Sequence, residues 1–537
     1  MRTRSPISRP KRGFLAVLGV IGLLAVSHAV SAQVADRLLV EECHAALERW
    51  EAGRALRTAE QLMERYPDEP AVLALVAQAE FLSGRYAATR KHLEAMKEAG
   101  ESPPEHLARI TGKLKDLHES FEETGSEHFR LRWARPVDGI MAEYAMEVLE
   151  KALDSLCTTL RWSPPERPIL VEIYPDTETF ATATTLSMEE INTSGAVAIC
   201  KFNRVMITSP RLYLQGYRWA DTLAHELTHY VLIRKTGHDI PVWLHEGTAK
   251  YCETLWRSGS SSSRLTPMQA TLLAEAREGD RFISFDRMHT SLVKLDSSEE
   301  VALAYAEVVS FIHFLHDLRG ESSLPDLIDR VAAGEKIQDV LRDMGGMEFD
   351  ALYARWKKWL GEQKLDRIPG LRVLPRKLSE GQDNTGRTAD LSGMLPDEAY
   401  RFVRLGDMLR DQSRPAAAAI EYRKGAGRTD YISPHLQVRL ARMEVRSGQL
   451  DSAQRTLRKM ARYYPDHLPL YLTRSELLQN RRQYQEATRA LETAAHINPF
   501  DPRVHQQLGT LYGLTGQKDK RRREERVLRR IYEWLKW

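Results

Sequence analysis

The sequence predicts an α+β protein, with a small mixed sheet and its helices in the middle of the chain and all-α helical repeats on both sides. Two observations support this prediction. Four short runs rich in β-branched and aromatic residues lie between residues 128 and 208, and helical periodicity follows them. In the C-terminal third, alanine, leucine and proline return with a period of about 34 residues, which is typical of stacked helix pairs.

The first 32 residues predict a secretory signal peptide. An apolar run over 14–26 follows several basic residues, and Val30-Ser31-Ala32 offers a small-residue cleavage site. We therefore expect an exported protein, periplasmic or secreted, with no transmembrane domain after cleavage and no later run able to span a bilayer. Because the apolar run is short for a membrane span, an uncleaved N-terminal anchor is the alternative.

The charge of the chain bears on its expected partners, and its cysteines bear on disulfide bonding. The net charge of +3 gives no reason to expect a nucleic-acid partner. Arg521, Arg522 and Arg523 precede Glu524 and Glu525, so a solvated terminal helix is the first interpretation and an acidic or membrane partner the second. In an oxidising compartment the cysteines permit three pairings, and the sequence favours none of them: Cys43, Cys157, Cys200 and Cys252.

Residues 397–537 are expected to form helix pairs. Gly448 and Gly516 bracket two periods, and the recurring positions are Ala453 and Ala487, Leu457 and Leu491, and Pro465 and Pro499. Residues 33–119 contain looser units, in which Gly53 with Leu62 and Gly84 with Leu93 share one offset. Both regions resemble tetratricopeptide (TPR) repeats. This resemblance implies that the pairs stack and bind a protein partner, although both regions could be mere structural caps.

The strand-like runs are 128–133, 169–174, 196–202 and 204–208. Together with the helices that follow, they predict a central domain over 120–365. Residues 366–396 are predicted to be a linker, because prolines, glycines and a polar run interrupt any periodic pattern there.

The strongest motif of the chain is His225-Glu226-Leu227-Thr228-His229. Apolar spacing predicts a helix over 219–233, ended by Gly237 and Pro241. Residues four apart share one helix face, so both histidines can direct a ring nitrogen at one Zn²⁺, with Glu226 as general base. The alternative is a core helix in which the two histidines are satisfied by ordinary hydrogen bonds.

A third metal ligand is expected from the segment that follows this helix. Leu232 and Lys235 exclude the metzincin pattern, which requires glycine and histidine at those positions. Asp239 lies on a turn without suitable flanking residues, and His245 would point about 100° away from its neighbour on a helix. Glu246 is the preferred ligand.

The preference for Glu246 rests on a resemblance. Residues 243–251 read Trp-Leu-His-Glu-Gly-Thr-Ala-Lys-Tyr and resemble the gluzincin motif W-L-x-E-G-x-A-x-Y, in which the glutamate binds zinc. The chain from about 128 to 360 resembles peptidase-MA-like gluzincin domains of exported bacterial proteins, which often occur alongside TPR repeats. The matching stretches are 219–230, 241–253 and 304–312.

The resemblance implies roles for two further side chains. Tyr305 matches a tyrosine that donates to the oxyanion in related enzymes, although ordinary core packing is an equally good interpretation. Glu253 is a weaker candidate for the third ligand and a better one for orienting a ligand histidine.

An edge strand before the zinc helix would hold the substrate backbone, and 195–199 or 204–208 could serve. Related aminopeptidases carry G-x-M-E-N there, whose glutamate anchors a free amino terminus, but Gly195-Ala-Val-Ala-Ile199 has no glutamate. The expected function is therefore an exported, endoproteolytic zinc metallopeptidase, with TPR repeats that bind protein. The alternative is a non-catalytic TPR scaffold or chaperone of the cell envelope with a structural metal site.

Overall fold

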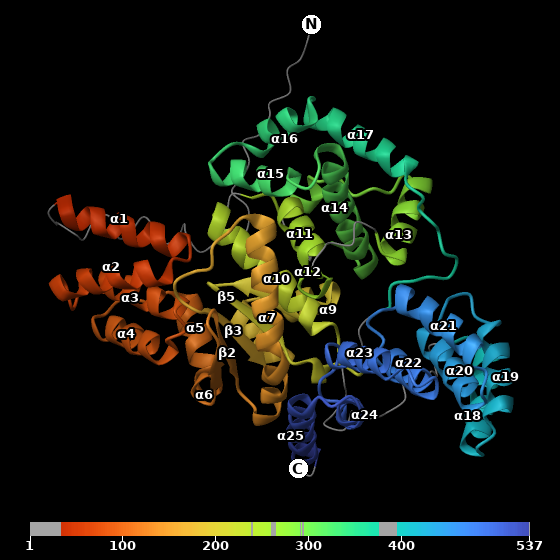
Figure 1. Ribbon diagram of the computed structural model, residues 1–537. Helices are drawn as coiled ribbons and strands as arrows, with labels where there is room; N and C mark the ends of the chain where they lie inside the picture. The colour runs from red at the N-terminus through yellow and green to blue at the C-terminus, as the bar shows by residue number, and fades with distance from the viewer. Residues whose placement is uncertain are drawn as a thin grey trace, which may run out of the picture.

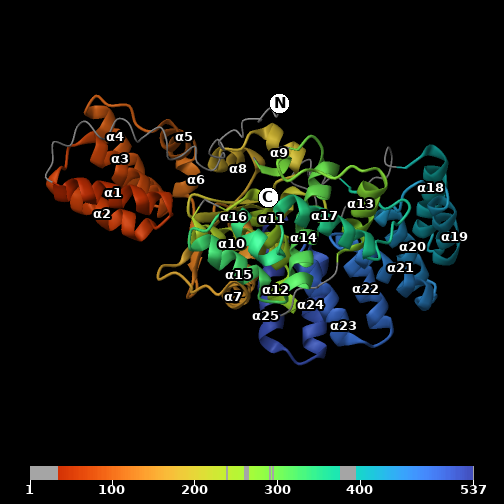
Figure 2. The same cartoon turned by 90° about the horizontal axis from the view of Figure 1, so that it is seen from above.

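The structure, a computed structural model, describes residues 34–237, 240–258, 265–289, 292, 295–374 and 395–535. The predicted signal peptide, Asp239 and most of the predicted linker lie outside these residues. Both views place the N-terminal and C-terminal helices on opposite sides of a central part that contains the sheet (Figures 1 and 2). The predicted α+β class, with a small mixed sheet and flanking helical repeats, is confirmed.

The sheet has the strand order β1-β2-β3-β5-β4 in the described residues. The strands are β1 (Glu122–Gly125), β2 (Phe129–Trp133), β3 (Ile169–Tyr174), β4 (Ala198–Lys201) and β5 (Arg204–Thr208). β2, β3 and β5 run parallel, whereas β1 and β4 pair antiparallel at the two edges. The prediction that 204–208 could be an edge strand is wrong, because β5 lies between β3 and β4. The edge strand next to the motif helix is β4.

The central helices surround this sheet. They are α7 (Gly139–Leu160), α8 (Thr177–Thr184), α9 (Met188–Ser194), α10 (Trp219–Thr236), α11 (Val242–Cys252), α12 (Leu255–Ser258), α13 (Pro267–Glu278), α14 (Ser298–Arg319), α15 (Ser323–Ala332), α16 (Ile337–Gly345) and α17 (Phe349–Glu362). α10 packs against α7, α11 and the strands β4 and β5. The motif helix therefore lies beside the open edge of the sheet.

Helix α14 was not expected to be long and apolar enough to cross a membrane, but by length and composition it is. Its most apolar window has a mean hydropathy of 1.3, and 67% of that window is buried inside the protein. The helix packs against α11, α13, α15 and α17. This burial is typical of the core helix of a folded domain, and the same helix carries Tyr305.

The N-terminal helices form pairs. They are α1 (Val34–Glu48), α2 (Ala52–Arg65), α3 (Pro70–Leu82), α4 (Tyr86–Glu98), α5 (Glu105–Lys113) and α6 (Lys115–Glu119). Trp50 and Gly84 have left-handed backbones at the turns between paired helices, with φ of 55° and 70°. Gly53 instead lies inside α2, so its predicted equivalence to Gly84 is wrong. Trp50 occupies the turn position that glycine occupies at residue 84, so a search for recurring glycines misses this repeat.

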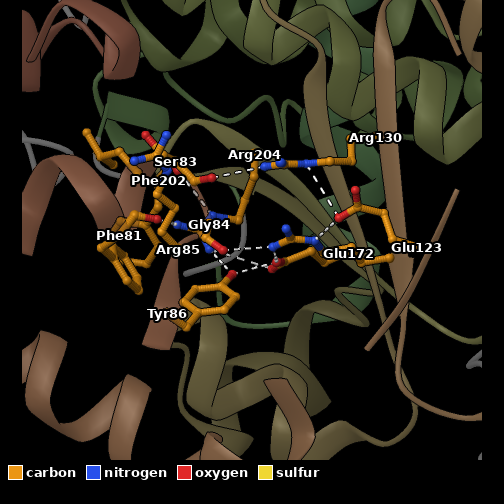
Figure 3. Close-up of polar contacts among 12 residues, drawn as sticks. Phe81, Ser83, Gly84, Arg85, Tyr86, Glu123, Arg130, Glu172, Phe202 and Arg204 are labelled. Atoms are coloured by element: carbon orange, nitrogen blue, oxygen red, sulfur yellow. Dashed lines mark hydrogen bonds and ion pairs between the residues drawn. The ribbon is translucent and has the colours of Figure 1, made fainter. Parts of the chain in front are cut away.

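A buried ion-pair cluster ties these helices to the sheet (Figure 3). Tyr86 of α4 donates a hydrogen bond to Glu172 of β3 at 2.5 Å. The guanidinium of Arg204 in β5 donates to the hydroxyl of Tyr86 and to the carbonyl of Phe81, and lies 3.7 Å from Glu172. Removing one member would strand a buried charge, which is strongly destabilising. The N-terminal helices are thus fixed to the central part.

The C-terminal helices continue the paired pattern. They are α18 (Asp397–Asp411), α19 (Pro415–Ala426), α20 (Pro434–Arg446), α21 (Leu450–Tyr463), α22 (Leu468–Asn480), α23 (Tyr484–Ala495), α24 (Pro502–Leu514) and α25 (Lys518–Leu535). Gly448 and Gly516 have φ of 79° and 75° at their turns, where a side chain would be strained. Ala453 and Ala487 are fully buried, as close helix pairing requires.

The last helix pairs dock on the central part. Tyr144 of α7 donates a hydrogen bond to Glu524 of α25 at 2.7 Å, and His505 of α24 lies 2.7 Å from the same carboxylate. These three side chains are buried. A second contact reaches the motif helix, because the indole N–H of Trp219 donates to the carbonyl of Ala495 at 3.0 Å.

Candidate metal centre

Helix α10 presents both motif histidines on the side that faces α11. The rings of His225 and His229 lie 4.8 Å apart between centroids and are almost perpendicular. The helix begins at Trp219 and ends at Thr236, and Gly237 follows it with a φ of 69°, at the predicted stop. α11 begins at Val242, after Pro241. The two helices pack together, so the residues of α11 reach the histidines.

Glu246 of α11 converges on both histidines. Its Oε2 atom lies 3.4 Å from Nε2 of His225 and 3.5 Å from Nε2 of His229. A tetrahedral zinc ion with bonds of about 2.0–2.1 Å separates its ligand atoms by roughly 3.3 Å. Oε2 of Glu246 therefore lies at the spacing of a zinc ligand from both imidazole nitrogens, and three protein ligands of these types would leave a fourth position for water or substrate. His225, His229 and Glu246 fit the metal that the motif implies.

Glu226 lies beside this group and is buried. Ligand-type atoms of His225, Glu226 and His229 all fall within 4.8 Å of one another. Burial raises the pKa of Glu226, against the opposing effect of the two imidazoles, and a backbone hydrogen bond from Cys200 of β4 steadies its charged form. The carboxylate is thus held between the motif helix and the edge strand, with a proton affinity above that of an exposed glutamate.

Glu253 contacts His225 at the ring nitrogen that does not face Glu246, and Lys250 pairs with Glu253. Oε2 of Glu253 lies 3.5 Å from Nδ1 of His225, and Nζ of Lys250 lies 2.7 Å from the other carboxylate oxygen. Burial would lower the pKa of His225, but the hydrogen bonds to Glu246 and Glu253 outweigh it and raise the pKa to about 10. An acceptor on Nδ1 leaves Nε2 directed at Glu246. Glu253 thus occupies an orienting position rather than a ligand position.

Tyr305 of α14 reaches the same carboxylate. Its hydroxyl donates a hydrogen bond to Oε2 of Glu246 at 3.1 Å. Burial and the nearby carboxylates of Glu246 and Glu226 raise the pKa of Tyr305 well above its ordinary value, so the hydroxyl keeps its proton. The side chain brings a neutral donor to the group, whereas packing alone would not need the hydroxyl there.

His245 has a place in the site that its sequence position did not reveal. Its ring stacks on that of His229 with centroids 4.2 Å apart and planes inclined by 23°. In the described part of the chain, Nδ1 of His229 is buried without a hydrogen bond, and the stacked ring of His245 is one of the contacts of this imidazole. Helical rotation turns His245 away from the ligand position, yet places it over the neighbouring ring. A pattern search for ligands has no signal for such stacking.

The cysteines near the site are free thiols. Cys200 and Cys252 are buried, and within the described residues Cys43 and Cys157 are also unpaired. Burial raises the pKa of Cys252, which favours the thiol over the reactive thiolate.

Comparison with known families finds two matches in the chain. Residues 153–362 match the Peptidase MA superfamily, and residues 444–512 match a tetratricopeptide repeat family. The chain therefore contains a domain of the Peptidase MA superfamily together with TPR repeats. The family match spans α10, α11 and α14, which carry the candidate metal centre.

No curated protein matches the chain. Among solved structures, the chain is similar to TTC0263, a thermophilic TPR protein of Thermus thermophilus, with 24% identity over 25% of this chain and 74% of that one, at a TM-score of 0.23. MamA is 18% identical over 27% of this chain and 82% of that one, at 0.23. Yeast Tom70 is 10% identical over 93% of this chain and 85% of that one, at 0.24.

Proposed function

We propose that this chain is an exported zinc-dependent metallopeptidase that cleaves within proteins and uses its TPR repeats to bind a protein partner. The observation that carries the proposal is the convergence of His225, His229 and Glu246 beside a buried Glu226. The signal-peptide pattern of residues 1–32 supports export, to the periplasm or outside the cell.

The expected zinc ion would supply Lewis acidity, which polarises a peptide carbonyl and makes a water molecule easier to deprotonate. The remaining steps belong to side chains. Glu226 takes the proton of the attacking water on a carboxylate oxygen and passes it to the leaving amine. Its raised pKa favours uptake of the proton, because burial makes the charged carboxylate less stable. The hydroxyl of Tyr305 can donate a hydrogen bond to the oxygen of the carbonyl under attack.

The edge strand supports cleavage within a chain. Within the described residues β4 pairs with β5 along one side only, so its other side has main-chain groups suited to an extended peptide. Residues 195–199 lack a carboxylate that would hold a free amino terminus. A substrate paired with this strand needs no terminus at the site, which is the requirement for endoproteolysis.

A Glu226→Gln variant tests the proposal against a structural metal site. We expect the wild-type chain to bind one zinc ion and to cleave a denatured protein, and a chelator to stop the cleavage. The variant should retain the zinc ion and lose activity, because glutamine cannot take the proton. Equal cleavage by both forms would overturn the assignment, and zinc binding without any cleavage would favour the scaffold alternative.

A further inference from the structure

Five arginines on the C-terminal repeats form a group that the peptidase proposal does not use. Arg410 lies on α18, Arg439, Arg442 and Arg446 lie on α20, and Arg503 lies on α24. We call this set the arginine strip. α18, α20, α22 and α24 are the first helices of successive pairs, and stacked repeats use such rows as extended binding surfaces.

Side-chain contacts join the four helices into one row. Nη1 of Arg439 lies 2.9 Å from Asp407 of α18, which links the first pair to the second. Nε of Arg442 lies 3.5 Å from Glu476 of α22. The side-chain amide of Gln479 in α22 donates to that of Gln507 in α24 at 3.4 Å. The strip therefore continues across the repeats as one surface.

The carboxylates along the row do not balance the guanidinium groups. Arg410 and Arg439 share Asp407, and Arg503 pairs with Asp501. Arg442 and Arg446 share Glu476 at 3.5 and 3.7 Å, longer than a charge-assisted hydrogen bond. Arg410 also pairs with Asp411 at 2.9 Å, so five cations face four carboxylates in these contacts.

Arg442 lies within this excess of positive charge. Burial lowers its pKa, the carboxylate of Glu476 opposes the change, and the charges of Arg446, Arg503 and Arg410 lower it further. Even so, 44% of its side chain is exposed, as is 44% of that of Arg446. A guanidinium that is crowded by like charges and still open to solvent gains most from an added anion.

We propose that the arginine strip binds an extended acidic segment of a protein partner, an inference that rests on the proposed use of the TPR repeats to bind protein. Arginine forks bind carboxylates with two parallel hydrogen bonds, and an extended acidic peptide supplies carboxylates at intervals. The acidic residues within the row argue for a peptide over a nucleic acid. Asp407 and Glu476 would repel a continuous phosphate backbone, whereas a peptide can turn its uncharged side chains or its amide groups towards them.

The test measures binding alone, in a chain that carries Glu226→Gln, so its outcome does not depend on peptidase activity. The probes are a labelled peptide in which Asp and Glu alternate with small residues, its Asn and Gln isostere, and a labelled single-stranded oligonucleotide. We expect the acidic peptide to bind at least about tenfold more tightly than the isostere, and its affinity to fall as salt rises.

Charge reversal at the strip should remove this preference. Arg442→Glu with Arg446→Glu should weaken binding of the acidic peptide at least about tenfold. The matched control is Arg458→Glu with Arg489→Glu, which makes the same charge change at exposed positions of α21 and α23 and should leave the affinity within about twofold. Arg442→Gln with Arg446→Gln keeps the row free of new repulsion, should also weaken binding, and guards against a folding defect.

Three outcomes would overturn the proposal. One is equal affinity for the acidic peptide and its isostere. Another is an equal loss of binding in the control variant, which would make the effect one of net charge. The third is tighter binding of the oligonucleotide than of the acidic peptide, which would assign the strip to a different class of partner.

Discussion

The indole N–H of Trp219 donates a hydrogen bond to the main-chain carbonyl of Ala495, with the two atoms 3.0 Å apart. Trp219 is the first residue of the helix that carries the candidate zinc ligands, and Ala495 is the last residue of α23 in the TPR repeats. The main-chain N–H of Tyr217 adds a second bond, to the carbonyl of Ile497 at 3.0 Å. The TPR repeats therefore hold the start of the motif helix directly.

Gly216→Ala should loosen this contact. Gly216 has φ of 72°, and a Cβ there would lie 2.2 Å from the carbonyl oxygen of Ile497, which is main chain and cannot rotate away. We expect a loss of about 3 kcal/mol in the free energy of unfolding, from overpacking and backbone strain together. Gly346→Ala is the control, because Gly346 has φ of 70° with open space around it and should cost only about 1 kcal/mol. The measurement is denaturant unfolding of both variants. If the contact were absent, the two variants would lose equal free energies of unfolding.

Tyr305→Phe separates catalysis from packing. The change removes the hydroxyl that donates to Glu246 and keeps the ring that packs in α14. If the hydroxyl stabilises the reacting oxygen, kcat should fall about 100-fold while zinc content and KM stay nearly constant. Steady-state kinetics with a quenched peptide, beside a zinc assay, would measure this. An unchanged kcat would leave Tyr305 as a packed core residue.

Glu253→Gln should weaken the metal site without removing a ligand. The carboxylate that faces Nδ1 of His225 would lose its charge, and the imidazole would become a poorer and less well oriented ligand. We expect the dissociation constant for zinc to rise about 10–100-fold in competition with a chromogenic chelator. Glu533→Gln, an exposed change on α25, should leave it unaltered. An unaltered constant for Glu253→Gln would remove its orienting role.

Glu307 should make stability fall as pH rises. Burial raises its pKa to about 8, above the value in an unfolded chain, so the folded state holds a proton that the unfolded state releases. The contribution is fully present below the unfolded pKa of about 4.3 and is lost towards pH 8, with a slope of at most about 1.4 kcal/mol per pH unit. Glu307→Gln keeps an acceptor for the N–H of Ile283 and should flatten this dependence. Unfolding curves at several pH values would contradict the assignment if both forms had the same slope.

The local pattern alone located most of the candidate site. The spacing of His225 and His229 follows from helical rotation, and Gly237 and Pro241 mark where the motif helix ends, so a single sequence was sufficient. Glu246 needed a resemblance, because nothing in its own neighbours shows that α11 folds back onto α10. The stacking of His245 was missed for the same reason: its partner is a ring on another helix.

The repeats and the sheet show a similar division. Small residues and prolines recur because each helix pair must close in the same way, and this made the C-terminal repeats visible. β1 was missed because its four residues, 122–125, carry no apolar signal and are held mainly by pairing with β2. The order of the strands could not be predicted from the sequence either, and β5 was therefore wrongly considered as an edge strand.

The sequence by itself determined the motif helix, the C-terminal helix pairs, most of the strands and the placement of Glu226 between His225 and His229, because these depend on periods of two and 3.6 residues along one segment. Tertiary structure alone decided which carboxylate meets the histidines, which strand forms the edge, and how the TPR repeats meet the motif helix. Such contacts join residues far apart in the chain, and the distance between them is set by the packing of many side chains at once rather than by any local preference.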